Sequence, residues 1–332
     1  MAEAQPAVRK LPYVAAITDG VREVLKEQDN AFVIGEDVAA AGSVYGYYKG
    51  LLEEFGPERL YDTPISEEGI MGLGAGAAAT GCRPIVDLMF MDFIGECMDE
   101  ISNQLAKMRY MFGGHARLPV TVLTMSGAGA SLAAQHSQSL EAWLCHVPGL
   151  KVVMPSSPYD AKGLIIAAAR DDNPVFVVLN KVMLGMMGEV PEGAYEVPIG
   201  KANVLRAGRN YTIVSMGRMV HESLKAAEKL KALGIDTEVI DARSLQPFDT
   251  ATVVESVRKT HRVMVVHEAV RNCGFGAEIA AQIQEEAFDY LDAPVARVGA
   301  PFSPVPFSPA LEAHYVPNAE RIVAEAKKQL GL

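Results

Sequence analysis

Short apolar runs alternate with longer stretches of helical periodicity along most of the chain. In the first half, apolar runs bounded by turn residues predict strands at 31–35, 84–89, 120–124, 151–154 and 175–179. Helical patterns lie at 13–27, 68–80, 93–111 and 159–170. Strands that alternate with helices in this way predict a parallel sheet covered by helices.

A second alternating set follows after a break in the pattern. Residues 185–200 combine glycine and proline without apolar periodicity, and we interpret them as an interdomain linker. Beyond the linker, strands are predicted at 211–216, 237–240, 262–267 and 295–297, and helices at 219–233, 250–260, 276–290 and 318–330. Residues 301–309 carry four prolines and predict an extended, ordered excursion. The pattern therefore predicts two successive α/β domains.

Composition narrows the class of protein. The chain has 332 residues, of which 49% are hydrophobic, and this length favours about two soluble domains. Its net charge of -11 argues against a nucleic-acid-binding protein. No apolar run is long enough for a membrane span, and residues 1–10 lack an apolar signal core. We therefore expect a cytoplasmic protein, with a trimmed organellar protein as the alternative.

Cysteine and histidine spacing predicts no transition-metal site. The four cysteines form no Cys-x-x-Cys pair, and the seven histidines form no His-Glu-x-x-His pattern. We expect the cysteines to be reduced and mostly buried.

The segment Asp-Thr-Pro-Ile-Ser-Glu at 62–67 is the first candidate for chemistry. It ends in Glu67 at the start of a helix rich in glycine and alanine, 69–81. Pro64 suits the first helical position and Thr63 its cap. So many glycines in one helix predict that another helix or a flat ring packs very close. The alternative is a first-turn glutamate that only complements the helix dipole.

The second candidate is Gln-His-Ser-Gln at 135–138. It follows a glycine-rich loop, 126–131, at the end of a predicted strand, which is where open α/β sheets bind ligands. The near-neutral pKa of a histidine suits His136 for proton transfer, although it could equally be a surface residue of a polar loop. The glycine pattern lacks the third glycine of a dinucleotide fingerprint, because Leu132 stands there.

Two further positions lie where strands are predicted to end. Glu36 follows the first strand and could reach a crevice, or could simply be a polar strand end. Phe93 follows the second strand and could stack on a heteroaromatic ring, although core packing is the commoner use of such a residue.

Taken together, these segments resemble the beta subunit of the thiamine-diphosphate-dependent decarboxylase component of 2-oxoacid dehydrogenase complexes, of the pyruvate or acetoin dehydrogenase type. The resemblance covers essentially the whole chain, and its motifs are specific only in combination. They fall in the family's order at 35–38 (Gly-Glu-Asp-Val), 62–67, 81–84 (Gly-Cys-Arg-Pro), around 93, 135–138, 148–153 (Pro-Gly-Leu-Lys-Val-Val), 160–164 (Asp-Ala-Lys-Gly-Leu) and 267–268 (His-Glu).

The resemblance implies an α/β fold with a pyrimidine-type parallel-sheet domain at 1–185, a linker at 186–204 and a transketolase C-terminal-like α/β domain at 205–332. It implies that Glu67 binds the pyrimidine N1′ of thiamine diphosphate and activates the cofactor, with Glu36 as a second carboxylate of that proton network. Phe93 matches an aromatic residue against the pyrimidine. His136 matches a catalytic histidine that handles the intermediate and acyl transfer to lipoyl groups.

The resemblance also implies metals and partners. Some members bind a structural potassium ion, for which the matching positions are Val120, Ala168, Ala169, Asp171 and Asn173. Thiamine enzymes hold the diphosphate through Mg²⁺ with a Gly-Asp-Gly motif, which this chain lacks. An alpha subunit is therefore expected to supply Mg²⁺ binding within a heterotetramer of two alpha and two beta chains. The acyl group is expected to pass to the lipoyl acyltransferase component.

The acyl donor stays open at the level of sequence. The runs 88–93 and 109–114 look closer to acetoin dehydrogenase than to branched-chain forms, while pyruvate and other 2-oxoacids remain alternatives. Two other classes are a non-catalytic α/β scaffold subunit and a self-sufficient transketolase-like enzyme. The second is disfavoured by the missing Mg²⁺ motif and the short chain.

Overall fold

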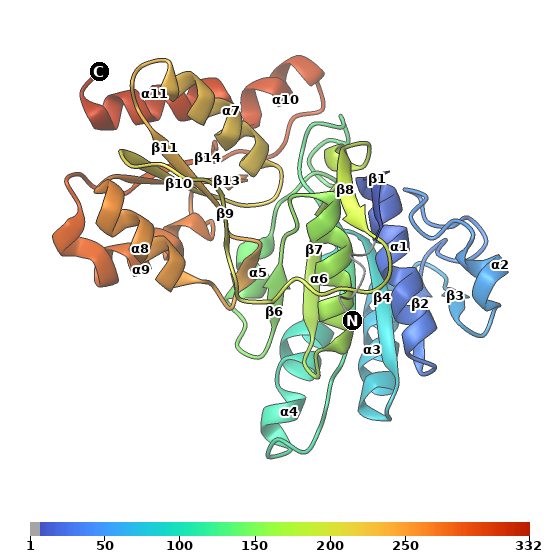
Figure 1. Cartoon of the computed structure of the whole chain (residues 1–332). Helices are drawn as coiled ribbons and strands as arrows, with labels where there is room; N and C mark the ends of the chain where they lie inside the picture. Colours follow the sequence, from blue (N-terminus) through green and yellow to red (C-terminus); the bar gives the residue numbers. More distant parts are fainter. Residues whose placement is uncertain (1–6) are drawn as a thin grey trace, which may run out of the picture. The chain divides into compact units, whose positions relative to one another are not determined.

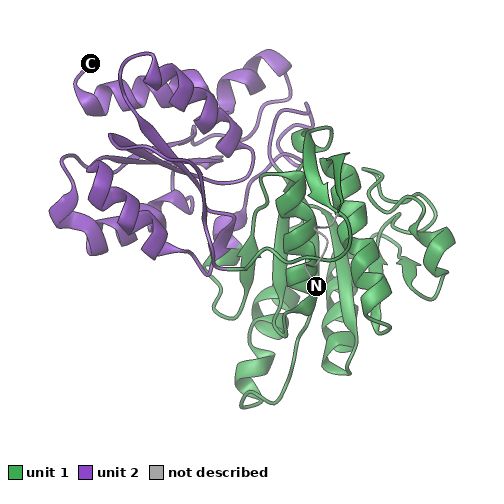
Figure 2. Cartoon of the chain, in the orientation of Figure 1, with its two compact units in different colours: residues 1–126, 144–199 green, residues 127–143, 200–332 purple. Residues whose placement is uncertain are grey.

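The computed structural model describes residues 7–332, which form two compact units (Figure 2). Unit 1 comprises the described residues through Ser126 together with Leu144–Ile199. Unit 2 comprises Gly127–Trp143 and Gly200–Leu332. The segment that carries His136 therefore belongs to unit 2, although it lies between two parts of unit 1 in the sequence.

Unit 1 is built on a parallel sheet whose strands follow the order β6-β7-β5-β4-β2-β3 (Figure 1). Its strands are β2 (Ala31–Gly35), β3 (Leu60–Asp62), β4 (Arg83–Phe90), β5 (Thr121–Ser126), β6 (Lys151–Val153) and β7 (Val175–Asn180). Apart from β3, each overlaps a predicted strand. The central strands β5 and β7 are buried at every position, as expected for a parallel sheet covered on both faces.

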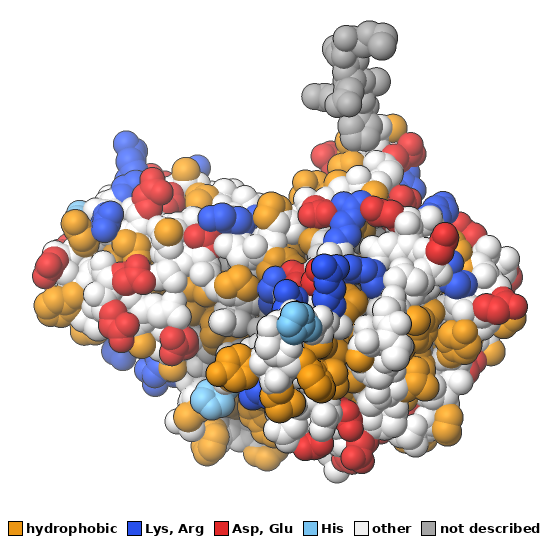
Figure 3. Space-filling view, turned by 90° about the horizontal axis from the view of Figure 1, so that it is seen from below, with side chains coloured by type: hydrophobic (Ala, Val, Ile, Leu, Met, Phe, Trp, Pro, Cys, Tyr) orange, Lys and Arg blue, Asp and Glu red, His pale blue; other side chains and the backbone are white. Residues whose placement is uncertain are grey.

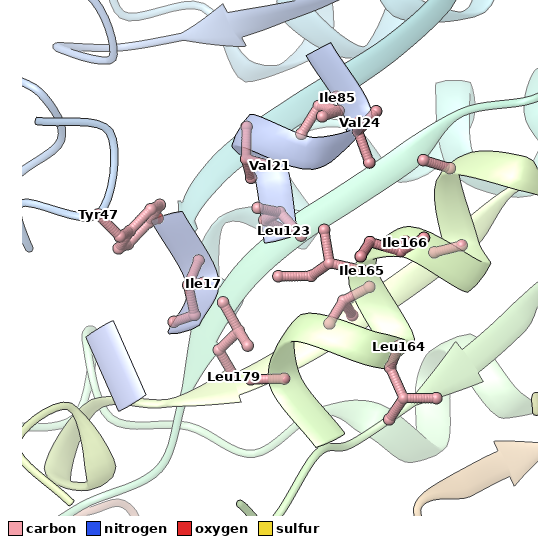
Figure 4. Close-up of a cluster of buried hydrophobic side chains, with 14 of the residues drawn as sticks. Ile17, Val21, Val24, Tyr47, Ile85, Leu123, Leu164, Ile165, Ile166 and Leu179 are labelled. Atoms are coloured by element: carbon pink, nitrogen blue, oxygen red, sulfur yellow. The ribbon is translucent and has the colours of Figure 1, made fainter. Parts of the chain in front are cut away.

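Helices α1 (Tyr13–Glu27) and α6 (Pro158–Arg170) pack against each other over this sheet. Figure 4 shows Ile17 and Val21 of α1 among Ile165 of α6 and Leu123 of β5, all fully buried. The remaining helices of unit 1 are α2 (Leu51–Phe55), α3 (Glu67–Ala79), α4 (Met108–Met111) and, across the boundary with unit 2, α5 (Glu141–Cys145). Burial of these apolar side chains is the main favourable contribution to folding of the unit.

A small antiparallel ribbon joins the ends of unit 1. Strand β1 (Val8–Pro12) pairs with β8 (Met187–Pro191). The segment 185–200, interpreted as an interdomain linker, thus contains a strand that its sequence pattern did not predict. An isolated five-residue edge strand carries little signal in its own sequence, because its partner lies far away along the chain.

Unit 2 contains a five-stranded sheet in the order β14-β13-β10-β11-β9. Its strands are β9 (Asn203–Arg206), β10 (Tyr211–Ser215), β11 (Thr237–Asp241), β13 (Val263–Val270) and β14 (Ala296–Ala300), and only β9 runs antiparallel to its neighbour. A further short strand is β12 (Ser244–Gln246). Helices α7 (Met219–Lys231) and α11 (Ala319–Leu330) pack together, as do α8 (Thr250–Thr260) and α9 (Gly276–Ala287) (Figure 1).

The structure can be compared with three local predictions: the helix at 93–111, the start of α3 and the proline-rich run. The single helix expected at 93–111 is wrong: the chain forms a 3-10 helix η1 (Met91–Gly95), a π-helix η2 (Glu100–Leu105) and then α4. Helix α3 begins at Glu67 with Ser66 as its cap, so Pro64 and Thr63 precede the helix instead of opening it. The proline-rich run is irregular until α10 (Pro309–Tyr315) begins, and η3 (Lys181–Met183) and η4 (Phe288–Tyr290) are single 3-10 turns.

Across residues 7–332, every helix is too short or too polar to cross a membrane. On the face drawn in Figure 3, apolar side chains reach the surface among acidic and basic ones.

Candidate active site

Glu67 is the first residue of α3, directly after the cap residue Ser66. The carbonyl of Ser66 accepts the first helical hydrogen bond from the amide of Ile70, at 2.8 Å. Asp62, at the other end of the motif, accepts hydrogen bonds from the amides of Ala39 and Ala40 at 2.7 and 3.0 Å. The motif therefore fixes both the start of α3 and the turn that follows β2.

Glu36 lies at the carboxyl end of β2, half-buried, beside the Glu67 carboxylate. Burial raises the pKa of Glu36, and the negative charges of Glu67, Asp37 and Asp87 raise it further. The protonated form of Glu36 is therefore favoured relative to that of an isolated, exposed glutamate.

Phe93 lies in η1, four residues before Cys97. The thiol of Cys97 lies 3.7 Å from the carbonyl of Phe93. Burial and the nearby Glu67 charge raise the pKa of Cys97 to about 12, so the thiol stays protonated. The Phe93 ring meets the Phe90 ring edge-on, with centroids 5.6 Å apart. The charges of Glu36 and Glu67 therefore interact, and Phe93 lies in η1, directly after β4, the neighbour of β2 in the sheet.

A buried polar network supports this edge, and the sequence reasoning missed it. Tyr47 donates a 2.6 Å hydrogen bond to Asp87, and the amide of Met89 donates another to the same carboxylate at 2.6 Å. Burial raises the pKa of Asp87, an effect that these hydrogen bonds oppose. A lone carboxylate in the apolar run Ile-Val-Asp-Leu-Met-Phe, 85–90, was the available signal.

Close packing explains one glycine of α3. A Cβ at Gly74 would lie 2.6 Å from the Val86 side chain, so only glycine allows α3 to approach β4 this closely. A Cβ at Gly76 would meet nothing within 4 Å, and Leu73 beside it is 51% exposed. The glycine-rich helix therefore has one face packed on the sheet and one open face in the single chain.

His136 lies in unit 2, half-buried, on the loop between β5 and α5. The amide of Gly127 donates to the carbonyl of Gln138 at 3.3 Å, which closes this loop two residues beyond His136. A cavity of about 540 Å³ lies beside it within unit 2. Its lining residues come from the loop and from later segments: 134–135, 138–140, 270, 302–305 and 315.

The five positions matched to a potassium ion lie at the start of β5, at the end of α6 and in the turn that follows. The carbonyl of Ala169 accepts a 2.9 Å hydrogen bond from Arg83, and the Asp171 side chain pairs with Lys151. The Asn173 side chain accepts from Arg109 at 3.0 Å. Protein cations already engage several of these acceptors, so the potassium site stays a prediction.

Residues 7–332 contain no group of three or more His, Cys, Asp or Glu side chains suited to a metal ion. The described residues therefore offer no carboxylate cluster of the kind that would hold a metal-bound diphosphate.

Two family models match successive parts of the chain. The transketolase pyrimidine binding domain matches residues 9–186, and the transketolase C-terminal domain matches residues 200–322. The chain is 47% identical to the acetoin:2,6-dichlorophenolindophenol oxidoreductase subunit beta of Bacillus subtilis, over 95% of this chain and 96% of that protein. It is 44% identical to the pyruvate dehydrogenase E1 component subunit beta of the same species, over 97% and 99% of the two chains.

A solved structure described as a split gene transketolase, inactive beta4 tetramer, matches with a TM-score of 0.80 and 26% identity over 97% of this chain and 99% of that chain. The predicted fold class is thereby confirmed. The chain belongs to the family of transketolase-like beta subunits of thiamine-diphosphate-dependent acetoin and pyruvate dehydrogenase components.

Proposed function

We propose that this chain is the beta subunit of an acetoin or 2-oxoacid dehydrogenase and that it supplies the pyrimidine half of a thiamine diphosphate site. The observation that carries the proposal is the electrostatic interaction of two carboxylates, Glu36 at the carboxyl end of β2 and Glu67 at the start of α3. A first-turn glutamate that served only the helix dipole would not need a second carboxylate next to it.

Each residue has a role that its position allows. Glu67 would hold a proton at N1′ of the pyrimidine, and Glu36, whose pKa is raised, would keep that proton within the pair. Phe93 would lie against the pyrimidine ring. When bound, thiamine diphosphate supplies the nucleophilic carbon that attacks the substrate carbonyl. His136 would carry protons during cleavage and acyl transfer to lipoamide.

The part of the site that this chain does not supply indicates what its partner has to bind. We assign Mg²⁺ and the diphosphate mainly to an alpha subunit, because this chain has neither the Gly-Asp-Gly motif nor a suitable carboxylate cluster among its described residues. The assembly proposed is two alpha and two beta chains that pass the acyl group to a lipoyl acyltransferase. Functionally, we divide the chain into a pyrimidine-binding domain at 1–185, a linker at 186–204 and a C-terminal domain at 205–332.

The test uses the beta chain co-purified with its natural partner, with thiamine diphosphate, Mg²⁺ and an artificial electron acceptor. Acetoin, pyruvate and branched 2-oxoacids are offered in turn. The Glu67→Gln variant should lose turnover by about 10²-fold or more, because a positioned acid or base contributes on that scale. Glu68→Gln is the matched control, since Glu68 is the exposed neighbour in the same helical turn.

Turnover of one substrate, lost in Glu67→Gln and kept in Glu68→Gln, would establish the mechanism and name the acyl donor. An intact heteromer that turns over none of the substrates and does not bind thiamine diphosphate would overturn the proposal. That result would support the scaffold alternative.

A further inference from the structure

The loop that carries His136 has a backbone that needs outside support. Gly127 and Gly129 have φ of 93° and 102°, and Ser131 and Ala133 have φ of 54° and 59°. The left-handed region is unfavourable for serine and alanine, so this conformation persists only where the surroundings hold it.

Ala128 is held on three sides within unit 2. Its amide donates a 2.8 Å hydrogen bond to Glu268, and its carbonyl accepts one of 3.1 Å from Arg218. Its methyl group is 1% exposed and belongs to the apolar core of unit 2. Arg218 also lies 3.7 Å from the Glu268 carboxylate, so the two side chains support each other.

Glu312 of α10 holds the next turn of the loop. One carboxylate oxygen accepts from the amide of Gly129 at 2.6 Å, and the other accepts from the amide of Ser131 at 3.0 Å. Glu312 is only 3% exposed, and Glu268 only 4%. A buried carboxylate that accepts backbone hydrogen bonds is expensive to disturb, because removing the interaction leaves buried polar groups unpaired.

We propose that Glu268, Glu312 and Arg218 act as a clamp that fixes the loop 127–138 and thereby positions His136, an inference that rests on the role of His136 proposed above. None of the three side chains is a catalytic residue in this scheme, because each contacts the loop and acts through it. The clamp joins β13, α10 and the start of α7, three elements far apart in the sequence, to one loop.

The substitutions Glu312→Gln and Glu268→Gln keep the shape of the side chains and test the clamp. A glutamine at 312 offers one acceptor oxygen and turns its amide group towards the second backbone N–H. Glu222→Gln is the matched control: the Glu222 carboxylate also accepts a backbone hydrogen bond in unit 2, but from Ala319 at the start of α11.

Hydrogen exchange of the assembled complex gives a direct readout. In both clamp variants, exchange in the peptide that covers 127–138 should rise by about tenfold, the scale of a lost charged hydrogen bond. The rest of unit 2 should exchange as in the parent protein, whereas Glu222→Gln should raise exchange at the start of α11 and leave the loop 127–138 unchanged. Unchanged exchange in the loop of both clamp variants would overturn the clamp.

Kinetics links the loop to His136. Turnover should fall by about tenfold in each clamp variant, and adding His136→Ala to Glu312→Gln should give no further loss beyond His136→Ala alone. Losses that simply multiply would overturn the positioning role. If His136→Ala itself kept full turnover, the proposed role of His136 would fail, and the exchange experiment would still decide whether the clamp exists.

Discussion

Glu141 at the start of α5 is a buried carboxyl without a strong partner. It is 1% exposed, and one of its oxygens has no hydrogen-bond partner among the described residues. Burial raises the pKa of Glu141 from 4.5 to about 7, with a smaller contribution from the Glu268 charge. The folded chain therefore holds this proton more tightly than the unfolded chain does, and folding is favoured while the carboxyl stays protonated.

Stability should accordingly depend on pH through Glu141. The contribution is fully present below the unfolded pKa near 4.5 and is lost as pH rises through about 7. The shift corresponds to about 3 kcal/mol at most, since one pKa unit is about 1.4 kcal/mol. The variant Glu141→Gln cannot ionise, so it should be more stable than the parent at about pH 8 and similar to it at about pH 5.

Urea unfolding at a series of pH values measures this difference. Glu286→Gln, at an exposed position of α9, is the control and should follow the parent at every pH. Equal pH profiles for Glu141→Gln and the parent would show that Glu141 does not titrate as its burial indicates.

Residue identity predicted part of the site, and packing decided the remainder. Glu36, Glu67 and Phe93 were named from motif positions; the structure shows that the charges of Glu36 and Glu67 interact, and the roles of the three residues stay predictions. Asp87 was missed although its place in an apolar run marked it, and Glu312 was missed because nothing in its local sequence indicates the amides that it accepts from. The sequence also did not indicate that His267 is buried among three glycines, where burial lowers its pKa to about 4 and keeps the ring neutral.

At the scale of elements, α3 depends on glycine where it meets β4. A Cβ added at Gly74 would lie 2.6 Å from the side chain of Val86, which is fully buried and cannot relieve the clash without moving its neighbours. The variant Gly74→Ala should lower the free energy of unfolding by about 1–3 kcal/mol, as overpacked cores do.

Gly76→Ala is the opposite case in the same helix. Its Cβ would meet nothing within 4 Å, so alanine should not destabilise unit 1 and should reduce the flexibility of the unfolded chain. Urea unfolding of the isolated beta chain compares the two variants. Equal loss in both would contradict the Val86 contact as the cause, because alanine has the higher helix propensity and has room at position 76.

Strands were easier to predict than irregular helices. Buried parallel strands appear in the sequence as short apolar runs, and every strand with such a run was predicted. The strands that were missed are the short ones β1, β3, β8, β9 and β12. The region 93–111 has helical periodicity, but the chain changes from a 3-10 helix to a π-helix there. Such changes in hydrogen-bond register are set by tertiary packing, which periodicity does not report.

At the scale of the whole molecule, the sequence does not indicate to which unit residues 127–143 belong. Residues 127–143 follow β5 of unit 1 directly, and only the contacts of Ala128 and Glu312 show that they belong to unit 2. The proposed cofactor half-site is likewise not complete within this chain, so it predicts a second chain that supplies the rest.

The open face of α3 gives the last prediction, which follows from the proposed heteromer. Gly69, Leu73 and Gly76 lie on this face, and Leu73 is 51% exposed. Small residues allow another backbone to approach closely, so a partner chain is expected to cover this face. Gly76→Leu has room within its own chain, where a Cβ meets nothing within 4 Å, but it should block that approach.

The variant should therefore fold with unchanged secondary structure and fail to assemble with the alpha chain, as measured by size-exclusion chromatography with light scattering. Lys231→Leu adds the same side chain to an exposed position of α7 and should assemble normally. Normal assembly of both variants would place the subunit interface elsewhere, whereas failure of both would point to the added leucine itself. Failure of Gly76→Leu alone would show that Gly76 of α3 is needed for assembly. Gly74 of the same helix serves the fold of unit 1 instead, because it is the position that packs on Val86.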